Sequence, residues 1–178
     1  MNCKSLRTSG ARARRTAAPN GFTLMELLIV MAIIAILSLL AIASIGVYTK
    51  HANSLSAINS VQKIVQAQMM YEESYPATGY ACSLDALGGD PHTGPPTLTS
   101  SQLLPQDLAS GFKQGYVFTI TCSDKVTVNN VERANGFIVT AKPQTEGKTG
   151  DRSYCSDETG QIKFDPAGAI PCTQLLGQ

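Results

Sequence analysis

The sequence has few of the side chains from which catalytic and metal sites are built. Its 178 residues include two histidines, His51 and His92, and no Cys-x-x-Cys pair. A structural zinc site needs four closely placed nitrogen or sulfur ligands, which this set does not offer. The histidines are far apart in the chain, which gives little support to a Ser/His or Cys/His catalytic pair. The sequence therefore predicts no metal, no cofactor and no enzymatic activity.

Acidic residues are missing from the first 21 positions, where five basic residues occur instead. The remaining residues have nine basic and thirteen acidic side chains, a net charge of −4. A basic segment in front of an apolar one stays on the cytoplasmic side of a membrane. The mildly acidic remainder lacks the basic footprint of nucleic-acid-binding proteins, so no nucleic-acid partner is expected.

No charged residue occurs in the 21 residues from Leu27 to Val47. As a helix this run would measure about 31 Å, enough to cross the core of a bilayer. Glu26 directly precedes it, and a charge at the edge of a membrane segment is costly and points to a function. An ordinary secretory signal, cleaved after Ala41-Ile42-Ala43, and a plain uncleaved anchor are two simpler interpretations. Neither gives Glu26 a role.

No proline occurs between Phe22 and Ser74, so one helix of about 50 residues, roughly 75–80 Å long, is allowed. Gly46 is the weak point of this helix, and whether it melts there stays open. Beyond the apolar run, apolar residues recur in steps of three and four, which is typical of an amphipathic helix. They are Leu55, Ile58, Val61, Val65 and Met69.

The rest of the chain predicts a loop followed by strands. Residues 74–115 form a long connection rich in glycine and proline, with a short helical turn at 101–108. Mixed β-branched and aromatic residues predict strands at 116–121 and 136–141. Residues 153–155 and 161–164 flank the turn at 157–160, which predicts a third and a fourth strand. The predicted fold class is α+β: a four-stranded antiparallel sheet packed on the C-terminal half of one long helix.

Four of the five cysteines follow the apolar run, which suggests two disulfides outside the cytoplasm. Four cysteines allow three connectivities, and sequence alone does not choose among them. We favour Cys82–Cys122 and Cys155–Cys172, because each link would close a loose segment onto a predicted strand. Cys172 would tie the tail to a hairpin, and Cys82 would tie the long loop to the first strand.

Gly21-Phe22-Thr23-Leu24-Met25-Glu26-Leu27-Leu28 resembles the type III signal of type IV prepilins and type II secretion pseudopilins, with Met25 in place of the commoner isoleucine. The resemblance continues through the apolar helix, at Tyr75-Pro76-Ala77-Thr78-Gly79 and in the hairpin at 152–160. It implies that a prepilin peptidase cuts between Gly21 and Phe22 and that the new Phe22 amine is methylated. It also implies that Glu26 pairs with the Phe22 amine of a neighbouring subunit during assembly.

With this resemblance, residues 1–21 are interpreted as a cleaved leader, 22–48 as the transmembrane and filament-core helix, and 49–178 as the globular α+β domain. The expected function is a structural subunit of a type IV pilus, polymerised with copies of itself by an assembly machinery. The chain would start in the bacterial inner membrane with this domain outside the cytoplasm, and end in an extracellular pilus. Alternatives are a pseudopilin of a type II secretion system, located in a periplasmic pseudopilus, and a signal-anchored periplasmic binding domain that never polymerises.

Three acidic residues near the C-terminus, Asp157, Glu158 and Asp165, admit two interpretations. They could bind calcium, which takes oxygen ligands, but Asp-Glu-Thr-Gly is also ordinary hairpin-turn chemistry, and we favour the turn. Tyr71 and Tyr75 are expected to lie in the core and to anchor the long loop.

We expect the mature chain to begin at Phe22 with a methylated amine. Mass spectrometry of the N-terminal peptide, taken from the membrane fraction, would detect it. Gly21→Leu should block this cleavage, because glycine can lie extended in a protease cleft without a side chain to accommodate. A mature terminus at Ser44 would instead indicate ordinary signal cleavage.

Overall fold

The structure, a computed structural model, describes residues 21–128 and 130–177. The predicted leader, residues 1–21, lies outside the described residues except for Gly21. The chain divides into two compact units, Met1–Ile42 and Ala43–Gln178, of which we call the second the head. Helix α1, Leu24–Ser74, contributes residues to both units.

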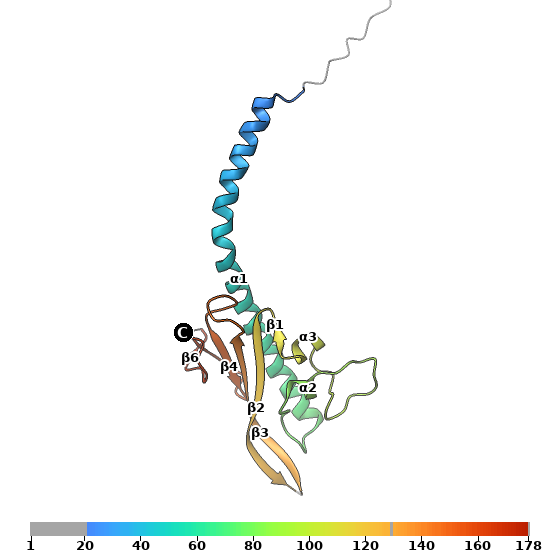
Figure 1. Cartoon of the computed structure of the whole chain (residues 1–178). Coiled ribbons are helices and arrows are strands. Elements are labelled where there is room, and N and C mark those ends of the chain that lie inside the picture. Colours follow the sequence, from blue (N-terminus) through green and yellow to red (C-terminus); the bar gives the residue numbers. More distant parts are fainter. Residues whose placement is uncertain (1–20, 129, 178) are drawn as a thin grey trace, which may run out of the picture. The chain divides into compact units, whose positions relative to one another are not determined.

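The predicted long helix is present as α1, which has 51 residues and ends just before Tyr75-Pro76 (Figure 1). Its length follows from the absence of proline, since proline removes a backbone donor and clashes with the preceding turn. Gly46 lies inside α1 and is helical in the structure.

The head contains one antiparallel sheet whose six strands follow one another in chain order. The strands are β1 (Phe112–Lys113), β2 (Tyr116–Val128), β3 (Val131–Pro143), β4 (Ser153–Asp157), β5 (Ile162–Asp165) and β6 (Gln174–Leu175). The predicted α+β class is confirmed. The four predicted strands correspond to β2–β5, and the two-residue strands β1 and β6 extend the sheet from four strands to six.

Strands β2 and β3 are longer than the sequence predicted, with 13 residues each. Their pairing continues through polar residues as far as Val128 and Val131. Strand β4 pairs with β3 only at 138–141, so the outer half of the β2–β3 hairpin extends past the other strands (Figure 1).

One face of α1 packs against the sheet and forms the core of the head. The helix contributes Ala57, Val61, Ile64 and Tyr71, and the sheet contributes aromatic and branched residues from β2, β3 and β4. The sheet residues are Tyr116, Phe118, Phe137, Val139, Ala141 and Tyr154. Steps of three and four place the helix residues on one side of α1, which explains why this side is buried.

The buried stripe of α1 is displaced from the one that the sequence predicted. Val61 and Val65 are buried and Ile58 is partly buried, but Leu55 and Met69 are 49% and 40% exposed. At about 100° per residue, Leu55 lies roughly 160° around the helix from Ala57. The predicted residues form one continuous stripe, which is rotated around the helix from the buried stripe, so that its edge with Leu55 and Met69 faces away from the sheet.

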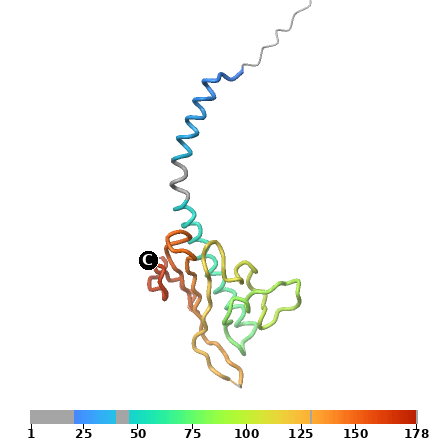
Figure 2. The backbone as a smooth tube through the Cα atoms, in the orientation of Figure 1, coloured from blue at the N-terminus to red at the C-terminus, as the bar shows by residue number. Residues whose placement is uncertain are grey.

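The connection between α1 and the sheet is held by hydrogen bonds and two short helices, α2 (Leu84–Leu87) and α3 (Gln106–Ala109). The Leu103 and Leu104 amides donate to the Leu87 carbonyl, and α3 overlaps the end of the predicted turn at 101–108. The segment between α2 and α3, yellow-green in Figure 2, loops out at the side of the head. The Tyr71 hydroxyl donates to the Leu98 carbonyl of this segment at 2.8 Å, so Tyr71 has the expected anchoring contact.

A glycine lets the start of this connection approach β3. Gly79 has a φ of +69°, and a Cβ there would lie 2.1 Å from the Ala134 carbonyl oxygen. The next residue, Tyr80, donates its backbone N–H to that same oxygen at 3.0 Å. A side chain at position 79 would therefore break the bridge between the connection and β3.

Gln68 is a polar residue in the middle of the buried stripe, and its side chain is 0% exposed. Its amide group donates to the Ala81 carbonyl at 2.7 Å and accepts from the Ala81 N–H at 2.8 Å. These two bonds pair a helix side chain with the backbone of the connection, much as a neighbouring strand would. They satisfy both backbone groups of Ala81, which is itself buried.

Gln68→Leu should destabilise the head by about 2–4 kcal/mol, because it leaves the buried N–H and C=O of Ala81 without partners. Denaturant unfolding of the detergent-solubilised chain measures this loss. Gln66→Leu is the matched control, since Gln66 is exposed on the same helix. A loss no greater than that of the control would contradict the proposed role of Gln68.

Candidate functional site

Thr23 caps the N-terminus of α1. The Thr23 carbonyl accepts the first helical hydrogen bond from the Leu27 amide at 3.3 Å, and its hydroxyl accepts from the Glu26 amide at 3.2 Å. Thr23 and Glu26 have the Thr-x-x-Glu spacing of a capping box, in which threonine satisfies an otherwise unpaired N–H. This cap was not predicted, although its spacing is visible in the sequence.

The cap leaves Gly21 and Phe22 outside the helix. Phe22 is 84% exposed, and a Cβ built on Gly21 would have no neighbour within 4 Å. The peptide bond between these residues is therefore non-helical and open to an approaching enzyme. An extended, accessible bond is what a peptidase needs, because a helical bond must first be unwound.

Glu26 lies in the first turn of α1, and its side chain is exposed. Within the described residues its carboxylate forms no ion pair. The positive end of the helix dipole favours a negative charge at this position. The structure thus places Glu26 and Phe22 at the same end of α1, with Thr23 between them.

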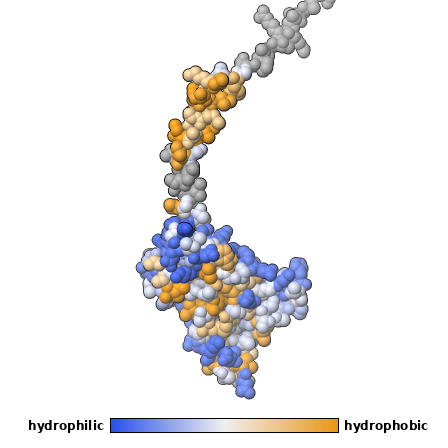
Figure 3. Space-filling view, in the orientation of Figure 1, coloured by the Kyte–Doolittle hydropathy of each residue, from blue (hydrophilic) through white to orange (hydrophobic). Residues whose placement is uncertain are grey.

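The apolar surface of α1 in the first unit is not covered by any residue that the structure describes. Every residue from 21 to 39 is exposed, with large apolar side chains between 49% and 84% exposed. Hydrophobic side chains cover this segment on the face shown in Figure 3. A helix that is apolar on all sides normally lies in a membrane or in the interior of a larger assembly.

Among the described residues, no helix meets the length and hydropathy required of a membrane span.

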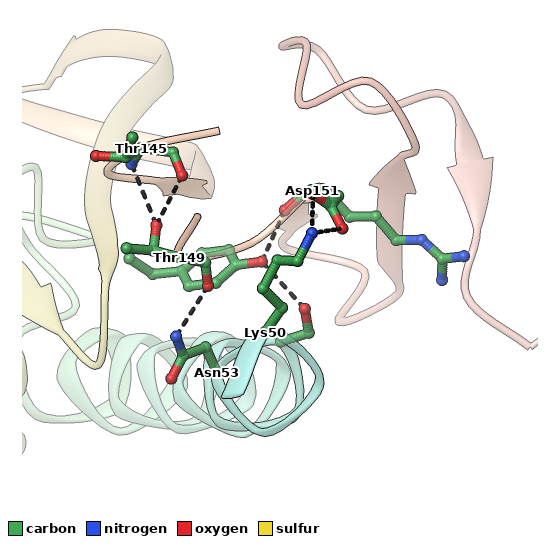
Figure 4. Close-up of polar contacts among 8 residues, drawn as sticks. Lys50, Asn53, Thr145, Thr149 and Asp151 are labelled. Atoms are coloured by element: carbon green, nitrogen blue, oxygen red, sulfur yellow. Dashed lines mark hydrogen bonds and ion pairs between the residues drawn. The ribbon is translucent and has the colours of Figure 1, made fainter. Parts of the chain in front are cut away.

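In the head, Lys50 and Asn53 of α1 are joined to the loop before β4 by polar contacts (Figure 4). Lys50 forms an ion pair with Asp151 at 3.1 Å, and the Asn53 amide donates to the Thr149 carbonyl at 2.9 Å. The Thr149 hydroxyl in turn donates to the Thr145 carbonyl, which closes the loop on itself. An exposed ion pair such as Lys50–Asp151 contributes about 0–1 kcal/mol, so the part-buried hydrogen bond of Asn53 matters more for holding the loop.

The Tyr116 hydroxyl links α1 to Arg152, the residue that directly precedes β4. It donates to the Arg152 carbonyl at 3.0 Å and lies 3.2 Å from the Ser54 hydroxyl. Burial raises the pKa of Tyr116, a shift that the hydrogen bond with Ser54 partly offsets. The phenol therefore stays neutral and acts as a structural hydrogen-bonding group.

Two disulfides join the cysteine pairs that the sequence analysis favoured. Cys82–Cys122 links the connection to β2, and Cys155–Cys172 links β4 to the C-terminal segment. The two pairs are 40 and 17 residues apart. In the chain-entropy model such links stabilise a fold by about 3–4 kcal/mol each.

The acidic residues near the C-terminus are engaged in turns. Asp157 accepts hydrogen bonds from the Thr159 amide at 3.0 Å, from the Thr159 hydroxyl, and from Lys163 at 3.1 Å. Asp165 accepts from the Ala167 and Ala169 amides at 2.9 and 3.0 Å. These contacts match the turn interpretation, and in the described part of the chain no three His, Cys, Asp or Glu residues group as metal ligands.

Opposing effects set the pKa of Asp157. Partial burial is the largest and raises the pKa, but hydrogen bonds from Thr159 and Lys163 together outweigh it. The net result is a pKa below the ordinary value of 3.8. The ionised carboxylate therefore stabilises the β4–β5 hairpin.

Comparison with known proteins identifies one segment. Residues 18–46 match the prokaryotic N-terminal methylation motif. The matched stretch includes Gly21, Phe22, Thr23 and Glu26, whose geometry is given above for the described residues. No curated protein and no solved structure matches the chain.

Asp157→Asn should lower the free energy of unfolding at pH 7. The folded-state pKa of Asp157 is lowered, so its stabilisation is present above the unfolded value of 3.8 and is lost as the pH falls through the folded value. The difference between wild type and variant should therefore shrink toward acid, which urea unfolding over a pH series measures. Glu158→Gln, at the exposed neighbouring position, is the control and should show little difference. A pH-independent loss in Asp157→Asn would contradict this account.

Proposed function

We propose that this chain is the precursor of a filament subunit of the type IV pilin kind. The N-terminal methylation motif supports a type IV pilin-like or pseudopilin precursor. The observation that supports the filament role is the apolar surface of residues 22–39, which the described residues leave exposed on all sides. Lipid would cover this surface in the precursor, and copies of the same helix would cover it in the filament.

Processing comes first in this proposal. The basic leader stays in the cytoplasm, and a prepilin peptidase cuts the non-helical bond between Gly21 and Phe22. The same class of enzyme methylates the new amine. The chain is a substrate of these enzymes and has a structural role itself. The Thr23 cap supports this order of events, because it keeps the cut site outside α1 before cleavage.

Assembly then depends on Glu26. The cut creates an amine four residues before this carboxylate, so each subunit carries both charges at one end of α1. A lone carboxylate at a membrane helix centre costs about 2.5–3.5 kcal/mol, and somewhat less near the edge. Pairing Glu26 with the Phe22 amine of the next subunit compensates both charges and sets the axial register. Such head-to-tail contacts generate helical filaments.

The location after assembly is proposed to be an extracellular pilus, built by a membrane-bound assembly machinery. Two disulfides suit a domain that works outside the cytoplasm. Isolation of surface fibres that contain this chain as their main component would support the pilus. Recovery of the chain only in short periplasmic assemblies would support a secretion pseudopilus instead, and a processed chain that never polymerises would reject both.

Glu26→Ala, expressed as the only copy, should be cleaved nearly as well as wild type and should strongly reduce fibre assembly. Immunoblots separate precursor from mature chain, and sheared surface fractions quantify the fibres. Glu26→Gln is the sharper variant, because glutamine can serve in the capping box but carries no charge. If charge pairing drives assembly, alanine and glutamine should fail alike. Wild-type fibre levels in Glu26→Gln would show that charge pairing is not required.

A further inference from the structure

A groove in the head combines an apolar lining with a basic rim. It has a volume of about 470 Å³, and its lining includes Val47, Leu55, Ile58 and Leu176 together with Lys50 and Arg152. Val47, Leu55 and Leu176 are 67%, 49% and 39% exposed, so no part of the described head covers them. All of these residues belong to the unit Ala43–Gln178.

The charge of the groove differs from that of the rest of the head. Among the lining residues, Lys50 and Arg152 face the single acid Asp151. The other residues from 43 to 177 include seven basic and eleven acidic side chains, a net charge of −4. An acidic domain is repelled by an anionic surface, and this groove is a place where the local balance is positive.

Arg152 is available for an anionic ligand. Lys50 is paired with Asp151, but within the described residues no carboxylate lies within ion-pair distance of the Arg152 guanidinium. The guanidinium lies 5.2 Å from the centre of the Phe164 ring, which restricts its position without neutralising its charge. A guanidinium held in this way is suited to a phosphate group, which it binds through two parallel hydrogen bonds.

We propose that this groove rests on the membrane surface before assembly and accommodates phospholipid there. The phosphate would bind at Arg152 and Lys50, and the upper acyl chain would contact Val47 and Leu176. This inference rests on the proposed membrane insertion of residues 22–48. Continuity supports it, because Val47 belongs both to that segment and to the groove, and the next residue, Tyr48, is 73% exposed. Tyrosine followed by basic residues is typical of a membrane–water interface.

The proposed lipid contact would fix the orientation of the head relative to the membrane in the precursor. A head held only by a helix could rotate freely over the bilayer, whereas a lipid-filled groove would keep one side of α1 against the membrane. Only two basic side chains would attach the groove to the anionic surface, a contact weak enough to be released when the subunit is extracted.

The absence of tryptophan from the chain allows a direct test. A single Leu176→Trp reporter is placed in the full, uncleaved chain and reconstituted at low density into phosphatidylcholine–phosphatidylglycerol vesicles with brominated acyl chains, which quench nearby indoles. Leu98→Trp is the control, since Leu98 is 47% exposed and is bonded to Tyr71. Tyr71 lies about 32 Å along α1 from Lys50. We expect the reporter at 176 to lose most of its fluorescence and the control to lose little.

Charge variants test the phosphate contact. Arg152→Glu in the reporter chain should restore most of the fluorescence, whereas Lys63→Glu, the same change at an exposed position elsewhere on α1, should not. Leu175→Trp is a second reporter in case the variant at 176 disturbs the tail, since Leu175 is the neighbouring residue and is 37% exposed. Equal quenching at 176 and 98, or no effect of Arg152→Glu, would overturn the proposal.

The failure of this inference and that of the proposed function are distinguishable. Alkaline extraction of the same vesicles reports insertion independently of the groove. A chain that resists extraction but shows no quenching at 176 and 175 loses only the lipid contact. Fluorescence that changes with protein density and not with brominated lipid would show a second copy in the groove and overturn the lipid contact. A chain that is released by alkali refutes both.

Discussion

The packing of one side of α1 against the sheet is the contact on which the rest of the head depends. A stripe from Ala57 to Tyr71 meets the inner side chains of β2, β3 and β4, and a fully buried large side chain contributes about 1.5–3 kcal/mol. The outlying segments are attached to this centre by individual polar bonds. Gln68 holds the start of the connection, Tyr71 holds its outer part, and Arg133 bonds the β2–β3 hairpin to Glu72 at 3.0 Å.

The same helix has a second apolar region, in which the apolar residues are distributed differently around the helix axis. Near Val61 the apolar residues occupy one side, and polar residues such as Lys63 and Gln66 occupy the other. From 24 to 39 apolar residues occupy every side and are exposed. The first pattern is satisfied within one chain, whereas the second requires lipid or other copies. This difference, together with the methylation motif, is the physical basis for proposing an assembling subunit.

Much of this architecture could be predicted from the sequence. The absence of proline between Phe22 and Ser74 predicted α1. Residue composition and turn residues predicted β2–β5. These signals are local in the sequence. Features that depend on tertiary contacts were missed. Gln68 is buried only because Ala81 offers a donor and an acceptor, and a glutamine alone gives no sign of such a partner. The outer parts of β2 and β3 mix polar residues with the exposed Val126, Val128 and Val131, and the sequence analysis did not predict strands there. Their pairing follows from the hairpin itself. Leu55 was misplaced because it is apolar on a side that faces away from the sheet.

The strand order has a consequence for how the head can form. Each strand pairs with the strand that precedes it in the chain, and both disulfides close over 40 residues or fewer. No strand pairs with one that is distant in the sequence, so the loops that must close during folding are short. A chain delivered N-terminus first can therefore add one strand at a time to a growing sheet that already rests on α1. Vectorial folding of this kind limits the time during which unpaired strand edges are exposed to neighbouring chains, a useful property where many identical precursors are crowded together.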